Sequence, residues 1–206
     1  MTSRPLLLRL DITRRFNIRR TMGKEAEFDK LVDRYEKPIF NLIYRLIGDP
    51  DDAADLTQET FVAAYRSLDA FRGESTIYTW LYRIAVNKCR NRFKERDRRR
   101  TYEGSSLDAS EVFALDDQTT LQHLPDQAAP EVVLEKKELR LRIEQAMSRL
   151  PPDYRIVAVL RDIHGLSYEQ IAQATGLSID VVRTRLARAR GMLRRKLEPY
   201  LADYHG

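Results

Sequence analysis

A short stretch near the C-terminus carries side chains suited to hydrogen bonding with nucleic acid: Arg183, Thr184, Arg185 and Arg188. An arginine guanidinium can form two hydrogen bonds with a guanine edge, or it can pair with phosphates. On one helix, this spacing places the four side chains on or near an exposed surface that fits the major groove. A solvated basic helix face with no ligand is the alternative interpretation.

The residues just before this stretch predict a helix-turn-helix. Ser167 and Gln170 have the spacing of a capping box that opens one short helix. The small Ala172 lets a second helix cross closely, Gly176 suits a tight turn, and Ser178 can cap the second helix. Four apolar residues would hold the two helices together: Ile171, Leu177, Val181 and Val182. The pattern favours DNA binding over a plain helical hairpin, but alone it also fits repressors and activators.

A second candidate surface for nucleic acid lies between Ser75 and Arg100. It mixes aromatic and basic side chains: Tyr78, Trp80, Tyr82, Arg83, Lys88, Arg90 and Arg92. Aromatic rings stack on unpaired bases and cations follow phosphates, so the mixture suits single-stranded DNA. Trp80 also fits an apolar helical stripe, and we expect it in the core rather than as a stacking platform.

Charge is unevenly distributed along the 206-residue chain, whose net charge is +5. Residues 90–100 hold seven basic and two acidic side chains, and residues 183–196 hold seven basic and none acidic. Residues 101–135 hold eight acidic and no basic ones. The basic segments indicate an anionic partner, although such blocks are often only solvated faces.

The composition predicts a cytoplasmic protein with no membrane insertion. No apolar run approaches the roughly 20 residues that a membrane-spanning helix needs. The cluster Leu6 to Leu8 is too short for the apolar stretch of a secretory signal. Cys89 is the single cysteine, so no internal disulfide can form, and we expect a small buried apolar side chain there.

Helical periodicity divides the chain into two folded units. Residues 23–100 form the first, in which Asp49 and Pro50 predict a helix start just after Gly48. Residues 1–22 are interpreted as a basic tail.

Residues 101–130 lack sustained periodicity and are interpreted as an acidic linker. In the second unit, residues 131–206, one helix stops at Pro151 and the next runs from about Asp153 to Ile163. No alternating strand pattern is present. The predicted fold is all-α, with two small helical domains joined by the acidic linker and a helix-turn-helix in the second domain.

The sequence lacks the usual signatures of an enzyme. None of its eight glycines are two apart, so there is no G-x-G phosphate loop, and no P-loop is present. His123, His164 and His205 lie far apart and show no metal-ligand spacing with Cys89. We therefore expect no catalytic residues, no metal and no cofactor, and a protein that is not an enzyme.

Three segments together resemble bacterial RNA polymerase sigma factors of the extracytoplasmic-function family. Residues 55–73, DLTQETFVAAYRSLDAFRG, resemble the helix that grips the polymerase clamp. Residues 78–99, YTWLYRIAVNKCRNRFKERDRR, resemble the promoter-melting segment. Residues 150–190, LPPDYRIVAVLRDIHGLSYEQIAQATGLSIDVVRTRLARAR, resemble the C-terminal domain. The segments occur in the family's order, and the resemblance covers nearly everything from about residue 24 to 200.

The resemblance implies a protein that carries RNA polymerase to particular promoters. It assigns core polymerase binding to Asp55, Gln58, Glu59 and Phe61. It assigns −10 DNA binding to Tyr78, Asn87, Lys88 and Arg90. It assigns −35 DNA binding to Arg183, Thr184, Arg185 and Arg188. It places Asn87 in a loop that reads a base flipped out of the −10 element. The residues alone also allow an ordinary acidic face with Phe61 in the core, and an Asn87 that merely caps or interrupts a helix.

The partners implied are core RNA polymerase, promoter DNA and an anti-sigma factor. The resemblance also implies that the acidic linker threads into a positively lined channel of the polymerase; a solvated spacer is the alternative. The chief rival function is a two-domain repressor or activator that binds closed duplex, which needs neither a melting segment nor a clamp-binding helix.

Overall fold

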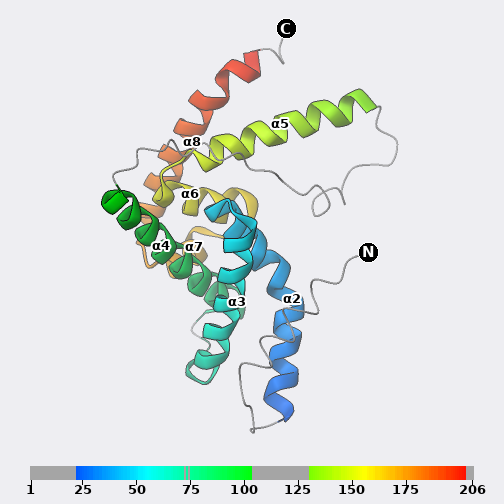
Figure 1. Cartoon of the computed structure of the whole chain (residues 1–206), viewed down its shortest axis with the longest axis vertical. Helices are drawn as coiled ribbons and strands as arrows, with labels where there is room; N and C mark the ends of the chain where they lie inside the picture. Colours follow the sequence, from blue (N-terminus) through cyan, green and yellow to red (C-terminus); the bar gives the residue numbers. More distant parts are fainter. Residues whose placement is uncertain (1–21, 72, 74, 104–129, 203–206) are drawn as a thin grey trace.

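The computed structural model describes residues 22–71, 73, 75–103 and 130–202, and its regular secondary structure within these ranges is helical (Figure 1). The elements in chain order are α2 (Met22–Ile47), α3 (Pro50–Ser67), the 3-10 turn η1 (Leu68–Ala70), α4 (Ile77–Glu103), α5 (Pro130–Ser148), α6 (Pro152–Ala158), the π-helical turn η3 (Val159–Ile163), α7 (Tyr168–Thr175) and α8 (Ile179–Ala202). The prediction of an all-α fold with two helical domains is confirmed. The predicted basic tail and nearly all of the predicted linker lie outside the described residues.

The N-terminal helices begin where local sequence signals place them. The Asp49 carboxylate accepts a hydrogen bond from the backbone N–H of Asp52 at 2.7 Å, and Pro50 is the first residue of α3. At the start of α4, the Thr76 hydroxyl accepts a hydrogen bond from the backbone N–H of Thr79 at 3.1 Å. These side chains satisfy amides that a helix end leaves without intrahelical partners.

The helices α2, α3 and α4 pack together around apolar side chains. Ile39, Leu42, Phe61 and Leu81 are fully buried there, and Cys89 lies in the same core. The prediction for Cys89 is confirmed. Burial raises the pKa of its thiol to about 12, so the reactive thiolate is scarce at neutral pH.

The predicted helix-turn-helix is confirmed as α7, a turn and α8, but Val181, which was expected to help hold the two helices together, is exposed. Both halves of the capping box are present: Ser167 Oγ accepts from the Gln170 N–H at 3.2 Å, and Gln170 Oε1 accepts from the Ser167 N–H at 2.8 Å. Gly176 ends α7 with φ of 71°, a left-handed conformation that favours glycine. Ser178 Oγ accepts from the Val181 N–H at 3.4 Å at the start of α8.

The helix predicted over residues 153–163 changes its winding partway. The α-helical turns of α6 pass into the π-helical turn η3, where the His164 N–H donates to the Val159 carbonyl at 3.1 Å. Single π-helical turns occur mostly inside α-helices and often at functional sites. Here the turn directs His164 toward the N-terminal unit, where it meets Tyr82.

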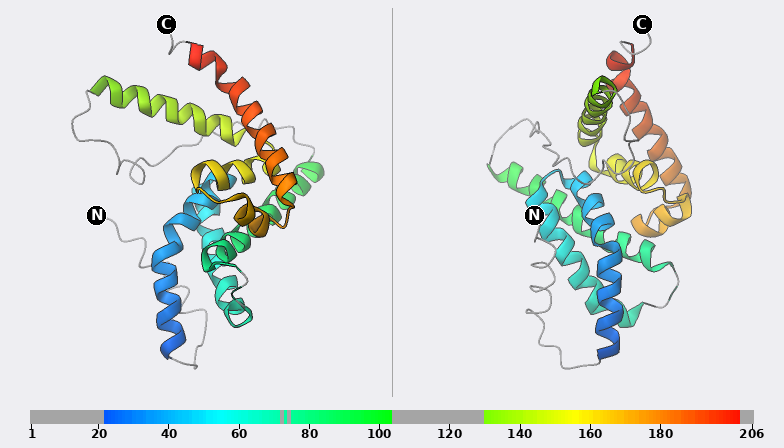
Figure 2. Two further views of the ribbon diagram at one scale, coloured as in Figure 1. Left: turned by 180° about the vertical axis from the view of Figure 1, so that it is seen from behind. Right: turned by 90° about the vertical axis from the view of Figure 1, so that its right-hand side faces the viewer.

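The two helical units pack directly against each other. α7 contacts α4, and both α6 and η3 contact α2 (Figures 1 and 2). Buried side chains of both units form one continuous core. Arg155 Nη1 of α6 donates to the Leu46 carbonyl at 2.7 Å, and Arg45 pairs with Glu144 of α5 at 3.3 Å.

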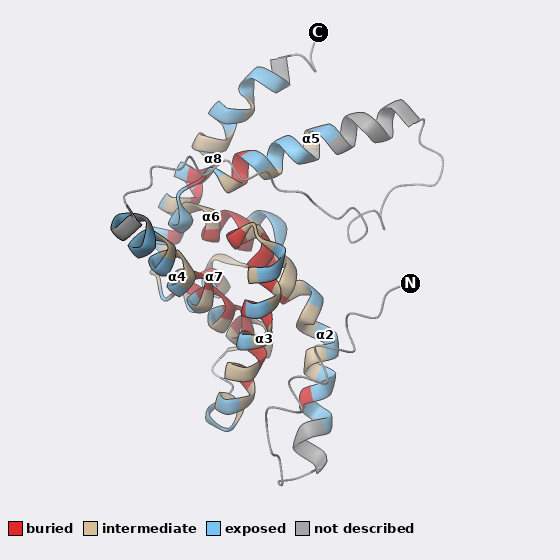
Figure 3. Ribbon diagram, viewed as in Figure 1, coloured by how far each residue is buried: buried red, intermediate tan, exposed pale blue. Residues whose placement is uncertain are grey.

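Two helices extend beyond this shared core. α5 and the C-terminal half of α8 project from the body of the molecule (Figure 1), and most of their described residues are exposed (Figure 3). The Arg142 guanidinium of α5 lies 4.1 Å from the centre of the Tyr200 ring of α8. Within the described ranges, every helix is too short or too polar to span a membrane.

Candidate DNA-binding and polymerase-binding surfaces

The second helix of the helix-turn-helix, α8, buries one side and exposes the other. Val182, Leu186 and Ala189 recur at helical spacing and pack inward. Arg183, Thr184 and Arg188 are all exposed, and 62% of the Arg183 side chain is accessible to solvent. Three of the four residues predicted to bind the −35 element therefore lie on the solvent side of one helix.

Arg183 is held loosely by two neighbours. Its guanidinium carbon lies 5.8 Å from the centre of the Tyr168 ring, and its Nη1 lies 3.8 Å from a carboxylate oxygen of Asp180. Exposed contacts of this kind contribute little to stability, so they leave Arg183 able to reach a ligand. Sequence reasoning did not single out Tyr168, whose ring lies beside Arg183 of α8.

Arg185 differs from the other three predicted −35 contacts. Its Nη2 lies 2.9 Å from Asp153 Oδ2 of α6, and only 26% of its side chain is exposed. The helical spacing places Arg185 nearer the buried side of α8 than Thr184 or Arg188. The structure therefore turns Arg185 toward its own unit, and the predicted DNA contact would first require it to leave Asp153.

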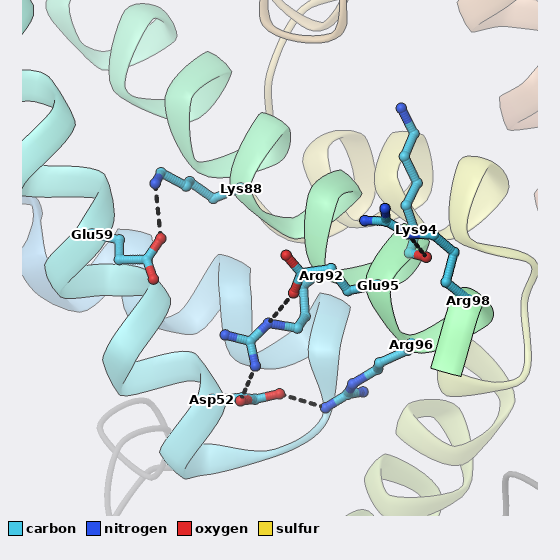
Figure 4. Close-up of polar contacts among 8 residues, drawn as sticks. All are labelled: Asp52, Glu59, Lys88, Arg92, Lys94, Glu95, Arg96 and Arg98. Atoms are coloured by element: carbon cyan, nitrogen blue, oxygen red, sulfur yellow. Dashed lines mark hydrogen bonds and ion pairs between the residues drawn. The ribbon is translucent and has the colours of Figure 1, made fainter. Parts of the chain in front are cut away.

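Two arginines of the basic segment hold α4 against α3. Arg92 Nη1 lies 2.5 Å from Asp52 Oδ1, and Arg96 Nη2 lies 2.7 Å from Asp52 Oδ2 (Figure 4). Arg96 Nη1 also donates to the Ile47 carbonyl at 3.2 Å. A carboxylate shared by two guanidiniums makes a strong local contact. These charges therefore have a structural partner within the unit.

The solvent side of α4 carries a polar and basic stripe. Asn87, Asn91, Lys94 and Arg98 follow one another at helical spacing and are all exposed. Lys94 and Arg98 point away from Asp52 in Figure 4. Sequence reasoning singled out Asn87 alone from this stripe. Steps of three and four residues from Asn87 lead to Asn91, Lys94 and Arg98. Sequence reasoning counted Lys94 and Arg98 only as part of the basic segment.

The expected loop around Asn87 is wrong. Asn87 lies inside α4, which is continuous from Ile77 to Glu103, so its side chain projects from a helix. Asn87 neither caps nor interrupts that helix. The nearest described residues outside a helix are Phe71, Gly73, Ser75 and Thr76, before α4 begins.

The aromatic residues at the start of α4 are largely packed inside the protein. The Tyr78 ring is half-buried between Tyr35 and Tyr82, with ring centres 5.8 Å and 4.2 Å away. Burial raises the pKa of Tyr78, which favours the neutral hydroxyl further. Trp80 packs against the core as predicted, 5.1 Å from the Phe71 ring.

Two basic residues predicted to bind the −10 element already have partners. Lys88 Nζ lies 2.8 Å from Glu59 Oε2 of α3 (Figure 4). Arg90 Nη1 donates to the Thr175 carbonyl at the end of α7 at 2.7 Å. Burial lowers the pKa of Arg90, but the side chain remains a cation at neutral pH. Arg90 thus bridges the two helical units in this arrangement.

The predicted polymerase-binding residues divide into surface and core. Asp55 and Glu59 are exposed and Gln58 is half-buried on α3. Phe61 is fully buried, with its ring centre 6.4 Å from that of Phe28. The structure does not place Phe61 on that surface. The Phe61 ring lies in the core below this surface of α3, where it is removed from water.

Comparisons with known proteins match both helical units. Residues 31–99 match the Sigma-70 region 2 family, and residues 140–193 match the Sigma-70 region 4 family. The chain is 38% identical over 181 residues to the RNA polymerase sigma-H factor of Pseudomonas aeruginosa, covering 88% of this chain and 91% of that protein. It is 37% identical over 179 residues to the ECF RNA polymerase sigma-E factor of Escherichia coli K12, covering 87% and 91%. Its fold resembles that of the sigma factor RpoE of Bartonella quintana, solved with the anti-sigma factor NepR, with a TM-score of 0.64, 23% identity and coverage of 84% and 97%.

Proposed function

The chain belongs to the extracytoplasmic-function (ECF) family of RNA polymerase sigma factors, and from this we propose which of its surfaces meets each partner. As a sigma factor, it binds core RNA polymerase and directs promoter-specific initiation of transcription. One observation carries the assignment of surfaces. Polar faces with suitable chemistry lie on α3, α4 and α8, within the segments that match regions 2 and 4.

At the −35 element, Arg183 and Arg188 supply guanidinium donors and Thr184 supplies a hydroxyl. Their common exposure on α8, opposite its buried side, supports this role. Arg185 positions α8 against α6 through Asp153, and it reaches a phosphate only after that ion pair opens.

At the −10 element, Asn87 presents an amide from the solvent face of α4. An amide can donate and accept hydrogen bonds at a base edge, and Lys94 and Arg98 extend the same stripe toward phosphates. Lys88 and Arg90 join this surface after they leave Glu59 and the Thr175 carbonyl. Tyr78 can stack on an unpaired base only after its half-buried ring moves outward.

The α3 surface formed by Asp55, Gln58 and Glu59 binds core polymerase in this proposal. Its exposed carboxylates suit a basic surface on the enzyme. Phe61 supports this surface from the core and does not touch the polymerase.

RNA synthesis is the polymerase's chemistry, and this DNA-binding initiation factor contributes no catalytic group. It acts in the cytoplasm, where bacterial RNA polymerase works. An anti-sigma factor is a fitting third partner, because a sigma factor of the same fold was solved with one.

Reconstitution of the full chain with core RNA polymerase tests these assignments. We expect the two to copurify and to start transcripts downstream of two elements at a fixed separation. Asp55→Lys should weaken copurification, whereas Asp97→Lys, the same charge change at an exposed site on α4, should not. A repressor or activator would instead bind closed duplex tightly without polymerase and yield no start sites, and that result would contradict the proposal.

A further inference from the structure

A histidine and a tyrosine meet at the contact between the two helical units. His164 Nδ1, at the end of η3, lies 2.7 Å from Tyr82 Oη of α4, and the two rings meet edge to face at 5.3 Å. Tyr82 is fully buried. The second imidazole nitrogen, Nε2, is closed off from solvent and has no hydrogen-bond partner among the described residues.

This environment selects the neutral form of the imidazole. The neutral ring with its proton on Nδ1 can donate to Tyr82 Oη and carries no proton on Nε2, whereas the protonated ring adds an Nε2 proton for which the described residues offer no acceptor. Tyr82 and Tyr78 of α4 are uncharged, and the nearby charge from α2 is Arg45, which pairs with Glu144 of α5 at 3.3 Å. Arg161 of η3 is occupied by the Leu166 carbonyl. Burial, followed by the charge of Arg45, lowers the pKa of His164 to about 4.

The packed arrangement is incompatible with the proposed reading of a promoter. The −35 and −10 elements lie about one and a half duplex turns apart, roughly 50 Å. In the structure α7 lies directly against α4, and Arg90 is bonded to the Thr175 carbonyl. The units must therefore separate before both surfaces engage DNA. Residues 104–129 allow this, because they can span at most roughly 90 Å at about 3.3–3.6 Å each.

We propose that His164 and Tyr82 form a proton-sensitive latch, which holds the two units together while the imidazole is neutral and releases them when it gains a proton. This inference rests on the proposed function only in stating that separation of the two units lets both surfaces bind DNA. Separation exposes His164 to water, where its ordinary pKa is about 6.5. Protons therefore bind the open form more tightly, so the packed-to-open ratio is highest above pH 6.5 and falls as the pH drops below it. A pKa of about 4 when packed and about 6.5 when open predicts that the packed-to-open ratio falls about tenfold between pH 8 and pH 5.5.

Energy transfer between two dyes on the full chain measures this ratio without polymerase or DNA. Cysteines introduced at Ala70 and Gln173, which are exposed on opposite units, carry the dyes, while the buried Cys89 stays unlabelled. We expect the packed fraction of the parent to fall between pH 8 and pH 5.5 with helical content unchanged. In His164→Gln, whose amide can replace the hydrogen bond but cannot titrate, the ratio should change less than twofold.

Two further variants make the test specific. His123→Gln and His205→Gln remove histidines outside the described residues and should keep the tenfold response. Tyr82→Phe removes the hydroxyl but keeps the ring, so it should lower the packed fraction already at pH 8. A parent that is equally packed at both pH values, or a His164→Gln variant that responds like the parent, would overturn the latch. Both results would leave the sigma factor assignment intact, since that assignment fails only if the parent chain does not direct transcription.

Discussion

Arg155 forms hydrogen bonds both to α2 and within its own unit, and its removal should destabilise the fold. Its Nη1 donates to the Leu46 carbonyl of α2 at 2.7 Å, and its Nη2 donates to the Leu150 carbonyl at 3.0 Å and to the Ser148 carbonyl. The substitution Arg155→Met keeps an apolar stem of similar length and removes all of these donors. The carbonyls near the ends of α2 and α5 would then lose their partner.

The structure sets the size of the expected loss. Three hydrogen bonds from a charged donor contribute about 4–9 kcal/mol before the cost of burying the charge. Burial lowers the pKa of Arg155 to about 10, and this shift from 12.5 corresponds to roughly 3 kcal/mol of that cost. The net contribution is therefore about 1–6 kcal/mol, and we expect Arg155→Met to lower the free energy of unfolding by about 3 kcal/mol.

Urea denaturation at pH 7.5, followed by far-UV circular dichroism, measures this change. Extrapolation to zero urea gives the free energy of unfolding for each protein. Arg188→Met is the matched control, because Arg188 is exposed on α8 and its loss should cost less than about 0.5 kcal/mol. Arg155→Lys should fall between Met and the parent, since one ammonium cannot reach three carbonyls in the same geometry. If Arg155→Met unfolds within about 0.5 kcal/mol of the parent, the hydrogen bonds do not stabilise the fold as argued.

Three other expectations concern function. Arg188→Ala should weaken −35 binding by about 1–3 kcal/mol and relax selectivity at one base, as measured by selection from random −35 sequences, whereas Arg185→Ala should mainly lower the stability of the fold. Unchanged selectivity in Arg188→Ala would count against the α8 surface as the −35 binding site. Asn87→Ala should leave copurification with core polymerase intact but reduce permanganate reactivity of melted promoter thymines, and equal reactivity would remove Asn87 from this role. Replacing residues 104–129 with a Gly/Ser chain of equal length should preserve −35 binding but reduce holoenzyme stability or early RNA synthesis in single-round transcription; full activity would show that the acidic segment is only a spacer.

Features fixed by neighbouring residues could be predicted from the sequence. The cap at Asp49, the reciprocal bonds of Ser167 and Gln170, and the left-handed Gly176 all depend on contacts within a few positions of the chain. The helix-turn-helix followed from these signals, and the all-α architecture followed from the helical spacing of apolar side chains. Both were confirmed.

Contacts between distant segments could not be read in this way. The positive charge of Arg90 and Arg185 suggested DNA, but charge alone does not say whether the partner is a phosphate, the Thr175 carbonyl or Asp153. Likewise, the pairing of His164 with Tyr82 joins residues 82 positions apart and depends on how two units pack. The resemblance placed Asn87 in a loop, whereas helix α4 is continuous from Ile77 to Glu103.

The ion pair between Lys88 and Glu59 joins a residue proposed to bind DNA to one proposed to bind polymerase. When polymerase binds the Glu59 carboxylate, the Lys88 ammonium is released and can bind a phosphate of the promoter. Polymerase and promoter DNA should therefore bind cooperatively. Thermodynamic reciprocity requires that polymerase strengthens promoter binding by the same factor by which the promoter strengthens polymerase binding. Because an exposed ion pair is worth at most about 1 kcal/mol, this route limits the cooperativity to about fivefold. A charge-reversed pair, Lys88→Glu with Glu59→Lys, would keep the contact while exchanging which ligand each side chain attracts.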